Sequence, residues 1–419
     1  MHAPARTPPR GGLPGRVPGA TMPAMHHTAG LILLAGVLAA ADPGWPGKRG
    51  PADDWTAPAA ASFPGATARE LWRMQIGAGC SGIAVAQGVA ITLGNTDNRD
   101  TVWCLDSATG AERWRVSYPS RLEPRGYEGG PNTTPCIDGE RVYSLSRQGL
   151  LLCLALADGR ELWRRDVAAD GVRQPNYGFS CSPVVRDGVL MLNIGTHGRA
   201  FACTDGRPLW SSGEVADGYA SATFASIDGA PSVLTFTRSA VSAARLADGV
   251  RLWSTPWTVK HAIADPLVLD GRVLVTHGYG SGSIVLALAD GQREAAFPQQ
   301  AFLGVLYPPI AYRGHLYGST GDKQTAGEYR CLRAADGKLM WSDTTLGTGA
   351  SIGVGPYLLV LTRRGFLALI DAAPEAFREH WRIKALPATC WTIPSVAGGR
   401  IYARDADGLL VCIEPAQRQ

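Results

Sequence analysis

Ten polar and aromatic residues lie in short segments that each lead into an apolar stretch, and such residues can build a ligand site. The segments are RGYEGGPNTTP, QPNYGFSCSP, DGYASATF, TVKHAIADP, VLYPP and TCWTIP. The residues are Arg125, Glu128, Asn132, Asn176, Tyr177, Tyr219, Lys260, His261, Asp265 and Trp391. Polar and aromatic groups that converge on one cavity typically bind a ligand. The alternative is that Glu128, Lys260 and Asp265 only pair with one another and with strand ends.

Established catalytic and metal-binding motifs are missing from the sequence. The histidines of the repeat region are scattered, without His-x-His or Cys-x-x-Cys spacing, at His197, His261, His277, His315 and His380. The stretch NTDNRD (95–100) lacks the Gly and final Glu of a calcium loop, so we expect a polar hairpin tip there. There is no Gly-x-Ser-x-Gly elbow, phosphate loop or dinucleotide fingerprint. We therefore assign no catalytic residue and expect no metal.

A Gly followed four residues later by Trp recurs along the chain and predicts how the elements pack. It appears in LDSATGAERW, LALADGRELW, FACTDGRPLW, ARLADGVRLW and LRAADGKLMW. Asp-Gly favours a tight turn with a positive φ at Gly. The Trp then lies in an outer strand, where its large ring can pack between neighbouring sheets. The predicted docking residues are Trp72, Trp114, Trp163, Trp210, Trp253, Trp341 and Trp381, with Phe297 in a weaker unit.

A second repeat, a turn Gly before an apolar strand, runs in step with the first. Its glycines are Gly88, Gly139, Gly188, Gly229, Gly271, Gly314, Gly355 and Gly399, which are 41 to 51 residues apart. This period is typical of propeller blades. The sequence predicts an all-β propeller of eight four-stranded antiparallel blades over residues 70–414. Because the last unit ends without an outer strand, we expect ELWRMQI to complete it, with Trp72 beside the blade from Tyr402 to Ile413.

Four of the nine cysteines share one slot of the repeat, directly before the apolar residue that opens the Trp motif. These are Cys104, Cys153, Cys331 and Cys412. Equivalent slots in different blades are too far apart for a disulfide. We therefore expect buried free thiols at these four positions, while the state of the other five stays open.

The first 41 residues differ from the rest of the chain. They carry Arg6, Arg10 and Arg16 and no acidic residue, and they end in AGLILLAGVLAAA (29–41). This pattern predicts a secretory signal, followed by an extended segment over 42–69 and a tail at 415–419; an uncleaved anchor is the alternative. Without residues 1–41, the basic count falls from 40 to 37 against 36 acidic residues. The nearly neutral net charge of the remaining chain argues against a nucleic-acid partner. We also expect no transmembrane span in the mature chain.

The repeat resembles that of the pyrroloquinoline quinone (PQQ) superfamily, whose unit is A-x-D-x-x-T-G-K-x-x-W. LDSATGAERW nearly matches it, and WPGKRGPADDW (45–55) is similar to the opening of exported bacterial PQQ-like propellers. The final stretch CWTIPSVAGGRIYARDADGLLVCIE is similar to their last blade, so the resemblance covers about residues 45–414. One branch contains quinoprotein dehydrogenases, which hold PQQ and calcium on the axis. Another contains the outer-membrane assembly factor BamB, which uses an eight-bladed ring as a scaffold for proteins.

Three functions follow from the residues and this resemblance. The first is an exported, non-catalytic scaffold that binds an envelope protein or another ligand at its axial face, without a cofactor. The second is a PQQ-dependent dehydrogenase, with Glu128 and Asn132 facing calcium and Asp265 as a base; the adjacent Cys pair typical of that branch is missing. The third is a carbohydrate-binding or hydrolytic propeller, which only Tyr177, Tyr219 and Trp391 favour.

Overall fold

The computed structural model describes residues 43–57, 67–213, 218–279, 281–294, 297–298, 301–304, 306–321 and 327–416. The predicted signal segment at 1–41 lies outside these residues, as does most of the predicted tail. Residues 42–419 group into one compact unit. Among the described residues, no helix has the length and apolar character needed to cross a membrane.

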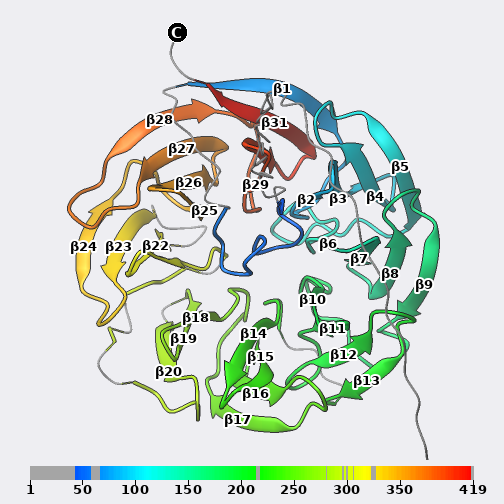
Figure 1. The fold of residues 1–419 in the computed structure, drawn as a ribbon, viewed down its shortest axis with the longest axis horizontal. Helices are drawn as coiled ribbons and strands as arrows, with labels where there is room; N and C mark the ends of the chain where they lie inside the picture. The colour runs from blue at the N-terminus through cyan, green and yellow to red at the C-terminus, as the bar shows by residue number, and fades with distance from the viewer. Residues whose placement is uncertain are drawn as a thin grey trace, which may run out of the picture. The chain divides into compact units, whose positions relative to one another are not determined.

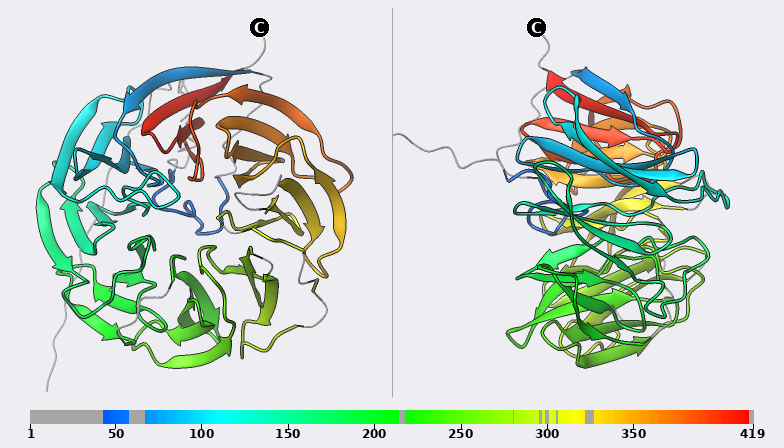
Figure 2. Two further views of the ribbon diagram at one scale, coloured as in Figure 1. Left: turned by 180° about the vertical axis from the view of Figure 1, so that it is seen from behind. Right: turned by 90° about the vertical axis from the view of Figure 1, so that its right-hand side faces the viewer.

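Eight sheets surround one axis (Figures 1 and 2). Blade 1 contains β2 (Ala84–Ala86), β3 (Val89–Thr96), β4 (Arg99–Asp106) and β5 (Glu112–Pro119); blade 2 contains β6 (Cys136–Asp138), β7 (Arg141–Leu145), β8 (Leu150–Ala155) and β9 (Glu161–Asp166). Blade 3 contains β10 (Val184–Arg186), β11 (Val189–Leu192), β12 (Arg199–Ala202) and β13 (Pro208–Ser211); blade 4 contains β14 (Thr223–Ile227), β15 (Ala230–Phe236), β16 (Ala240–Arg245) and β17 (Arg251–Pro256).

In the second half of the ring, as in the first, the strands of each blade are given from the axis outward. Blade 5 contains β18 (Leu267–Leu269), β19 (Arg272–His277) and β20 (Gly282–Ala287); blade 6 contains β21 (Ile310–Tyr312), β22 (His315–Thr320), β23 (Glu328–Arg333) and β24 (Leu339–Asp343). Blade 7 contains β25 (Gly349–Val354), β26 (Tyr357–Thr362), β27 (Phe366–Asp371) and β28 (Glu379–Lys384); blade 8 contains β29 (Ser395–Ala397), β30 (Arg400–Arg404), β31 (Leu409–Ala416) and β1 (Thr67–Gln75).

The predicted eight-bladed all-β ring is confirmed, with one correction in blade 5. Its sheet has three strands among the described residues, and only the isolated bridge between Leu286 and Arg293 extends it outward. Pro298 lacks the N–H that a further ladder bond would need. Phe297 is nevertheless buried and lies against Gly337 of blade 6, where a Trp lies in other blades.

The ring closes through the two ends of the folded unit, as predicted. Strand β1 pairs antiparallel with β31, from Thr67 opposite Ala416 to Gln75 opposite Leu409. In Figure 1 these blue and red strands lie side by side. The ring of Trp72 lies 6.0 Å from that of Tyr402 in the same blade. Closure gives blade 8 its fourth strand and covers the outer edge of β31, so that β1 is the outermost strand of this sheet.

Most of the outer-strand Trp residues join their blade to the next one through a specific contact. Trp114 Nε1 of blade 1 donates to Leu156 O of blade 2 at 2.8 Å. A Cβ at Gly159, in the β8–β9 turn of blade 2, would lie 2.7 Å from the Trp114 ring. Gly is therefore required both for its positive φ of 72° and for room for the indole. The same Trp-on-Gly contact occurs at Trp72/Gly110, Trp163/Gly206, Trp210/Gly249 and Trp253/Gly291.

The cysteine slot is explained by the same packing. Cys104 lies opposite Trp114 in the strand register, and Cys153, Cys331 and Cys412 lie opposite their own Trp residues. All four are buried free thiols, which confirms the prediction. Burial raises the pKa of Cys104 to about 12.

The N-terminal segment, defined here as residues 43–57, runs across the central opening (Figure 1). Trp45 forms a bridge to Val85 on blade 1, and Thr56 forms one to Gly353 on blade 7. Trp45 and Trp55 are almost completely buried, so both ends of the segment are anchored by indole side chains. Between these two bridges the segment forms turns rather than extended chain, with Gly50 N donating to Gly47 O and Asp53 N donating to Gly50 O.

Buried charges hold the middle of the N-terminal segment. Arg49 donates to Asp265 at 2.9 Å, to Asp53 at 2.7 Å and to the Ala222 carbonyl at 2.7 Å. Lys48 Nζ donates to the other Asp265 oxygen at 2.8 Å. Burial alone would lower the pKa of Arg49, but the carboxylates of Asp53 and Asp265 outweigh it and raise that pKa above its ordinary value. Asp265 thus ties the segment to blades 4 and 5.

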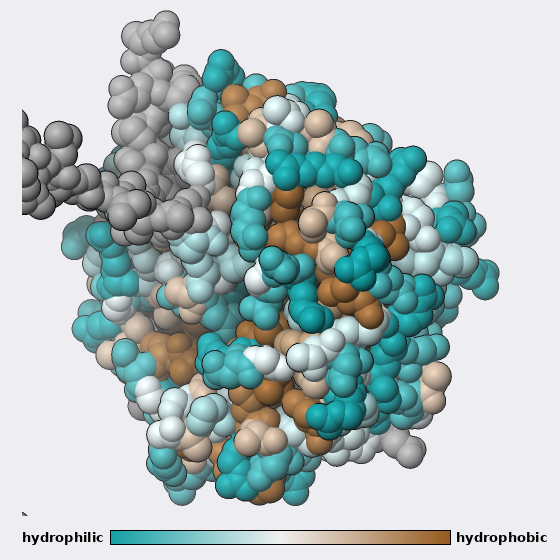
Figure 3. Space-filling view, turned by 45° about the vertical axis from the view of Figure 1, so that its right-hand side comes forward, coloured by the Kyte–Doolittle hydropathy of each residue, from teal (hydrophilic) through white to brown (hydrophobic). Residues whose placement is uncertain are grey.

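Exposed apolar side chains are few and lie mainly at the outer strands. Leu209, Val250, Leu252, Leu339 and Met340 are the aliphatic examples, on or beside β13, β17 and β24. On the face shown in Figure 3, apolar residues are interspersed with hydrophilic ones.

The Trp-on-Gly contact can be isolated by comparing two glycines. We expect Gly159→Ala to destabilise the fold by about 1–3 kcal/mol more than Gly188→Ala, because the new methyl group must displace the Trp114 ring. Gly188 has a similar φ of 76°, but a methyl carbon added there would meet no atom within 4 Å, so it reports the backbone cost alone. Urea unfolding midpoints measure both changes; equal losses would contradict the packing role.

The charge network of the N-terminal segment gives a second prediction. Asp265→Asn leaves the buried Arg49 with one carboxylate fewer and should cost about 3–5 kcal/mol of unfolding free energy. Asp248→Asn is the matched control, since the Asp248–Arg245 pair is exposed. Urea unfolding compares the two variants, and similar midpoints would show that Asp265 is not a structural anchor.

Candidate ligand site at the propeller axis

A cavity of about 230 Å³ opens where the innermost strands begin, and residues from all eight blades line it. One from each blade, in order, is Cys80, Asn132, Tyr177, Tyr219, His261, Tyr307, Arg363 and Trp391. Trp45 and Lys48 of the N-terminal segment also line the cavity, so the segment that crosses the axis contributes directly to it. The site therefore depends on both the blades and the N-terminal segment.

Half of the ten predicted residues line this cavity. These are Asn132, Tyr177, Tyr219, His261 and Trp391. The other five do not, namely Arg125, Glu128, Asn176, Lys260 and Asp265. Arg125, Asn176 and Lys260 are exposed, whereas Glu128 is half-buried and Asp265 is buried.

The three charged residues that were candidates for mutual pairing have different partners. Glu128 accepts a hydrogen bond from Trp391 Nε1 at 2.7 Å, which links the segments that lead into blades 2 and 8. Lys260 Nζ lies 4.8 Å from the centre of the Tyr279 ring. Asp265 binds Lys48 and Arg49 instead, and it also accepts from the Ser221 N–H at 2.7 Å. The alternative that these three residues pair with one another is therefore wrong, and the cations that bind Asp265 come from the N-terminal segment.

One wall of the cavity is an aromatic arc, which we define as Tyr127, Tyr177, Tyr219, His261 and Tyr279. Successive ring centres are 5.7 to 6.1 Å apart, and most pairs are edge to face. Burial lowers the pKa of His261, and the charges of Lys260 and Arg238 lower it further. A neutral imidazole therefore fits this wall, which offers ring faces and hydroxyl groups.

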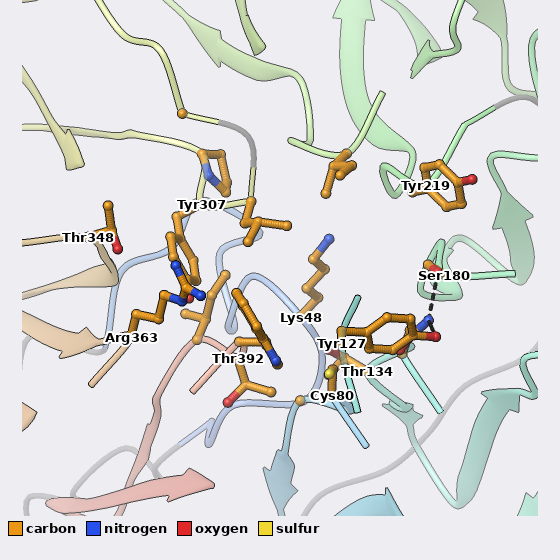
Figure 4. Close-up of a pocket in the computed structure, with 18 of the residues that line it drawn as sticks. Lys48, Cys80, Tyr127, Thr134, Ser180, Tyr219, Tyr307, Thr348, Arg363 and Thr392 are labelled. Atoms are coloured by element: carbon orange, nitrogen blue, oxygen red, sulfur yellow. Dashed lines mark hydrogen bonds between the residues drawn. The ribbon is translucent and has the colours of Figure 1, made fainter. Parts of the chain in front are cut away.

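The opposite wall combines a cation with aromatic rings. The Arg363 guanidinium lies 4.7 Å from the centre of the Trp391 ring. Tyr307 is buried, and its hydroxyl donates to the Cys390 carbonyl at 2.6 Å. Figure 4 shows Lys48 between Arg363 and Tyr307 on one side and Tyr127, Ser180 and Tyr219 on the other. The described lining contains the basic side chains of Lys48 and Arg363 and no carboxylate.

Asn132 lines the cavity and is held in place by its neighbours. Its Nδ2 donates to Ser180 Oγ at 3.1 Å and to the Tyr177 carbonyl at 3.2 Å. Its Oδ1 is buried without a hydrogen-bond partner in the described structure. Asn132 therefore holds the segments of blades 2 and 3 together beneath the aromatic arc.

Sequence reasoning missed several lining residues. Tyr127 and Tyr307 lie inside the segments already singled out, so the same pattern could have found them. Lys48 and Arg363 carried no such signal. Lys48 precedes the repeats, and Arg363 lies in the β26–β27 turn, so only the three-dimensional arrangement reveals that they share a cavity.

Three solved structures share this architecture, each at low sequence identity. BamB from Moraxella catarrhalis has a TM-score of 0.58 at 14% identity, over 84% of this chain and 99% of that one. A europium-containing methanol dehydrogenase has a TM-score of 0.68 at 11% identity, over 89% and 98%. The quinohemoprotein alcohol dehydrogenase from Comamonas testosteroni has 0.63 at 14%, over 90% and 81%. These likenesses show the fold alone.

The sequence comparison is more specific about family. No curated protein sequence matches the chain significantly. A family model described as outer membrane protein assembly factor BamB matches residues 98–342 and 325–418, which together cover most of the propeller. The chain therefore belongs to this BamB family of PQQ-repeat β-propellers.

Proposed function

We propose that the protein is an exported binding module of the cell envelope that holds a protein partner at its axial face. The observation that carries this proposal is the cavity mouth itself, where the leading segments of eight blades converge around aromatic and polar groups. Family membership adds support, because the family description names an assembly factor of the outer membrane. The basic, then apolar pattern of residues 1–41 supports export.

The groups at the site favour binding over chemistry. General acid–base catalysis needs a titratable group that can reach a substrate proton. Asp265 was the candidate base, but its oxygens accept from Lys48, Arg49 and the Ser221 N–H. Besides the imidazole of His261, the lining offers aromatic faces, hydroxyl groups and the side chains of Lys48 and Arg363, which can orient a ligand.

The dehydrogenase alternative requires a calcium ion beside PQQ, and the residues present do not fit that ion. Calcium prefers roughly six to eight oxygen ligands, including carboxylates. The described lining offers the Asn132 amide but no carboxylate, and the Glu128 carboxylate is engaged by Trp391. Within the described ranges, no group of three or more His, Cys, Asp or Glu residues could hold a metal. We therefore propose a function without PQQ and calcium.

The scaffold proposal is tested by capturing partners from the envelope fraction of the protein's own cells. The tagged wild-type chain should fractionate with the envelope and retain a specific protein. We expect the Glu128→Ala, Trp391→Ala double variant to lose it, because the mouth contact between blades 2 and 8 is removed. Arg251→Ala, on exposed outer strand β17, is the control. If the double variant and the Arg251→Ala control retain the partner equally, the axial face is not the surface that binds it.

The cofactor alternative is tested with PQQ and calcium together. We expect micromolar PQQ with calcium to change neither the melting temperature nor the quinone absorbance, because the cavity lacks carboxylate ligands. A saturable rise in melting temperature that chelation of calcium reverses would overturn the proposal and restore the dehydrogenase hypothesis.

A further inference from the structure

We propose that the axial cavity binds an acidic sugar unit, a hydroxylated ring that carries one carboxylate. This inference rests on the binding site of the proposed function and adds a ligand class to it. Three features of the cavity carry the argument: a cation without an acidic partner among the described residues, facing aromatic surfaces, and the ammonium group of Lys48.

The cation is Arg363. It is half-buried and lines the cavity from the β26–β27 turn, and its guanidinium packs on Trp391. Among the described residues no carboxylate forms an ion pair with it, unlike Arg49 or Arg147, which have Asp265 and Glu123. A planar guanidinium binds a carboxylate through two parallel hydrogen bonds, and its charge roughly doubles their strength. The lining formed by the described residues has no carboxylate, so the ligand would supply it.

The aromatic arc lies across the cavity from Arg363. Its ring faces favour a ligand with a non-planar sugar ring over one with a flat anionic ring. The electron-rich face of each Tyr attracts polarised C–H groups, which a sugar ring presents on its faces. The edge-to-face arrangement, such as 66° between Tyr177 and Tyr219, gives a stepped surface. A chair-shaped ring fits a stepped surface better than a flat ring does. The phenol hydroxyl groups are hydrogen-bond partners for sugar hydroxyls.

Lys48 supplies the donor on the floor. Its ammonium has three N–H groups, and two of them have partners, Asp265 at 2.8 Å and Ser221 at 3.1 Å. Because Asp265 balances the charge of Lys48, its third N–H serves as an oriented hydrogen-bond donor for a sugar hydroxyl. The volume of about 230 Å³ lies below the usual range of ligand pockets, roughly 300–1,000 Å³. The cavity therefore suits one terminal sugar unit.

Calorimetric titration of the full chain tests the charge requirement. The probes are glucuronic and galacturonic acid, their neutral parents glucose and galactose, and benzoate as a flat carboxylate. We expect a uronic acid to bind at least about tenfold more tightly than its neutral parent, since a hydrogen bond to a charged group is lost with the carboxylate. Added salt should weaken uronic acid binding and leave the neutral sugar unchanged.

Two neighbouring arginines provide a matched pair of variants. Arg363→Gln should remove the preference for the acid, whereas Arg364→Gln removes the same charge from an exposed position on the same turn and should keep it. Arg363→Lys retains the charge and should keep part of the preference, which guards against a general loss of folding. Melting temperatures verify that each variant is folded.

The opposing results are equally clear. Absence of uronic acid binding, equal affinity for acid and neutral sugar, retention of the preference in Arg363→Gln, or tighter binding of benzoate would each overturn the acidic-sugar assignment. These readouts need no protein partner. A failed partner capture with intact uronic acid binding would therefore reject only the scaffold role, and the reverse result would reject only the ligand class.

Discussion

The contact on which the structure depends is the indole of one blade lying on the turn glycine of the next. It combines burial of a large ring with a hydrogen bond such as Trp114 to Leu156. The turn needs Gly twice, for backbone conformation and for space. Because a propeller blade contacts only its two neighbours, this contact, which occurs at five of the eight blade junctions, holds adjacent blades together.

The N-terminal segment crosses the central opening of the ring and contributes side chains to the cavity. Burying Arg49 is costly unless the charge is paired and hydrogen-bonded, and Asp53, Asp265 and the Ala222 carbonyl satisfy it. The same network fixes the backbone that carries Lys48. A residue outside the repeats thus becomes part of the cavity, and an acidic residue that resembled a catalytic base becomes a structural anchor.

Most of the fold could be predicted because its determinants are local and repeated. The Asp-Gly turn, the Trp four residues later and the missing last strand together predict blade number and closure, and Trp72 opposite Cys412 confirms that closure. Blade 5 departed from the pattern where Phe297 replaces Trp. The site could be predicted only in part, because segment position indicates which residues approach the axis but not how they pair. Lys48 and Arg363 enter the cavity through contacts between distant parts of the chain, which spacing does not encode.

The closure of blade 8 also has a consequence for how the molecule is made. Strand β1 is the first strand in the chain, and its partner β31 is the last. During synthesis, β1 has no native strand partner until β31 has been made. Such distant pairing is a slow step of folding, and an unmatched strand edge is prone to aggregate. The ring therefore completes late and all at once, and shortening either terminus into these strands removes the closure rather than trimming a loose end.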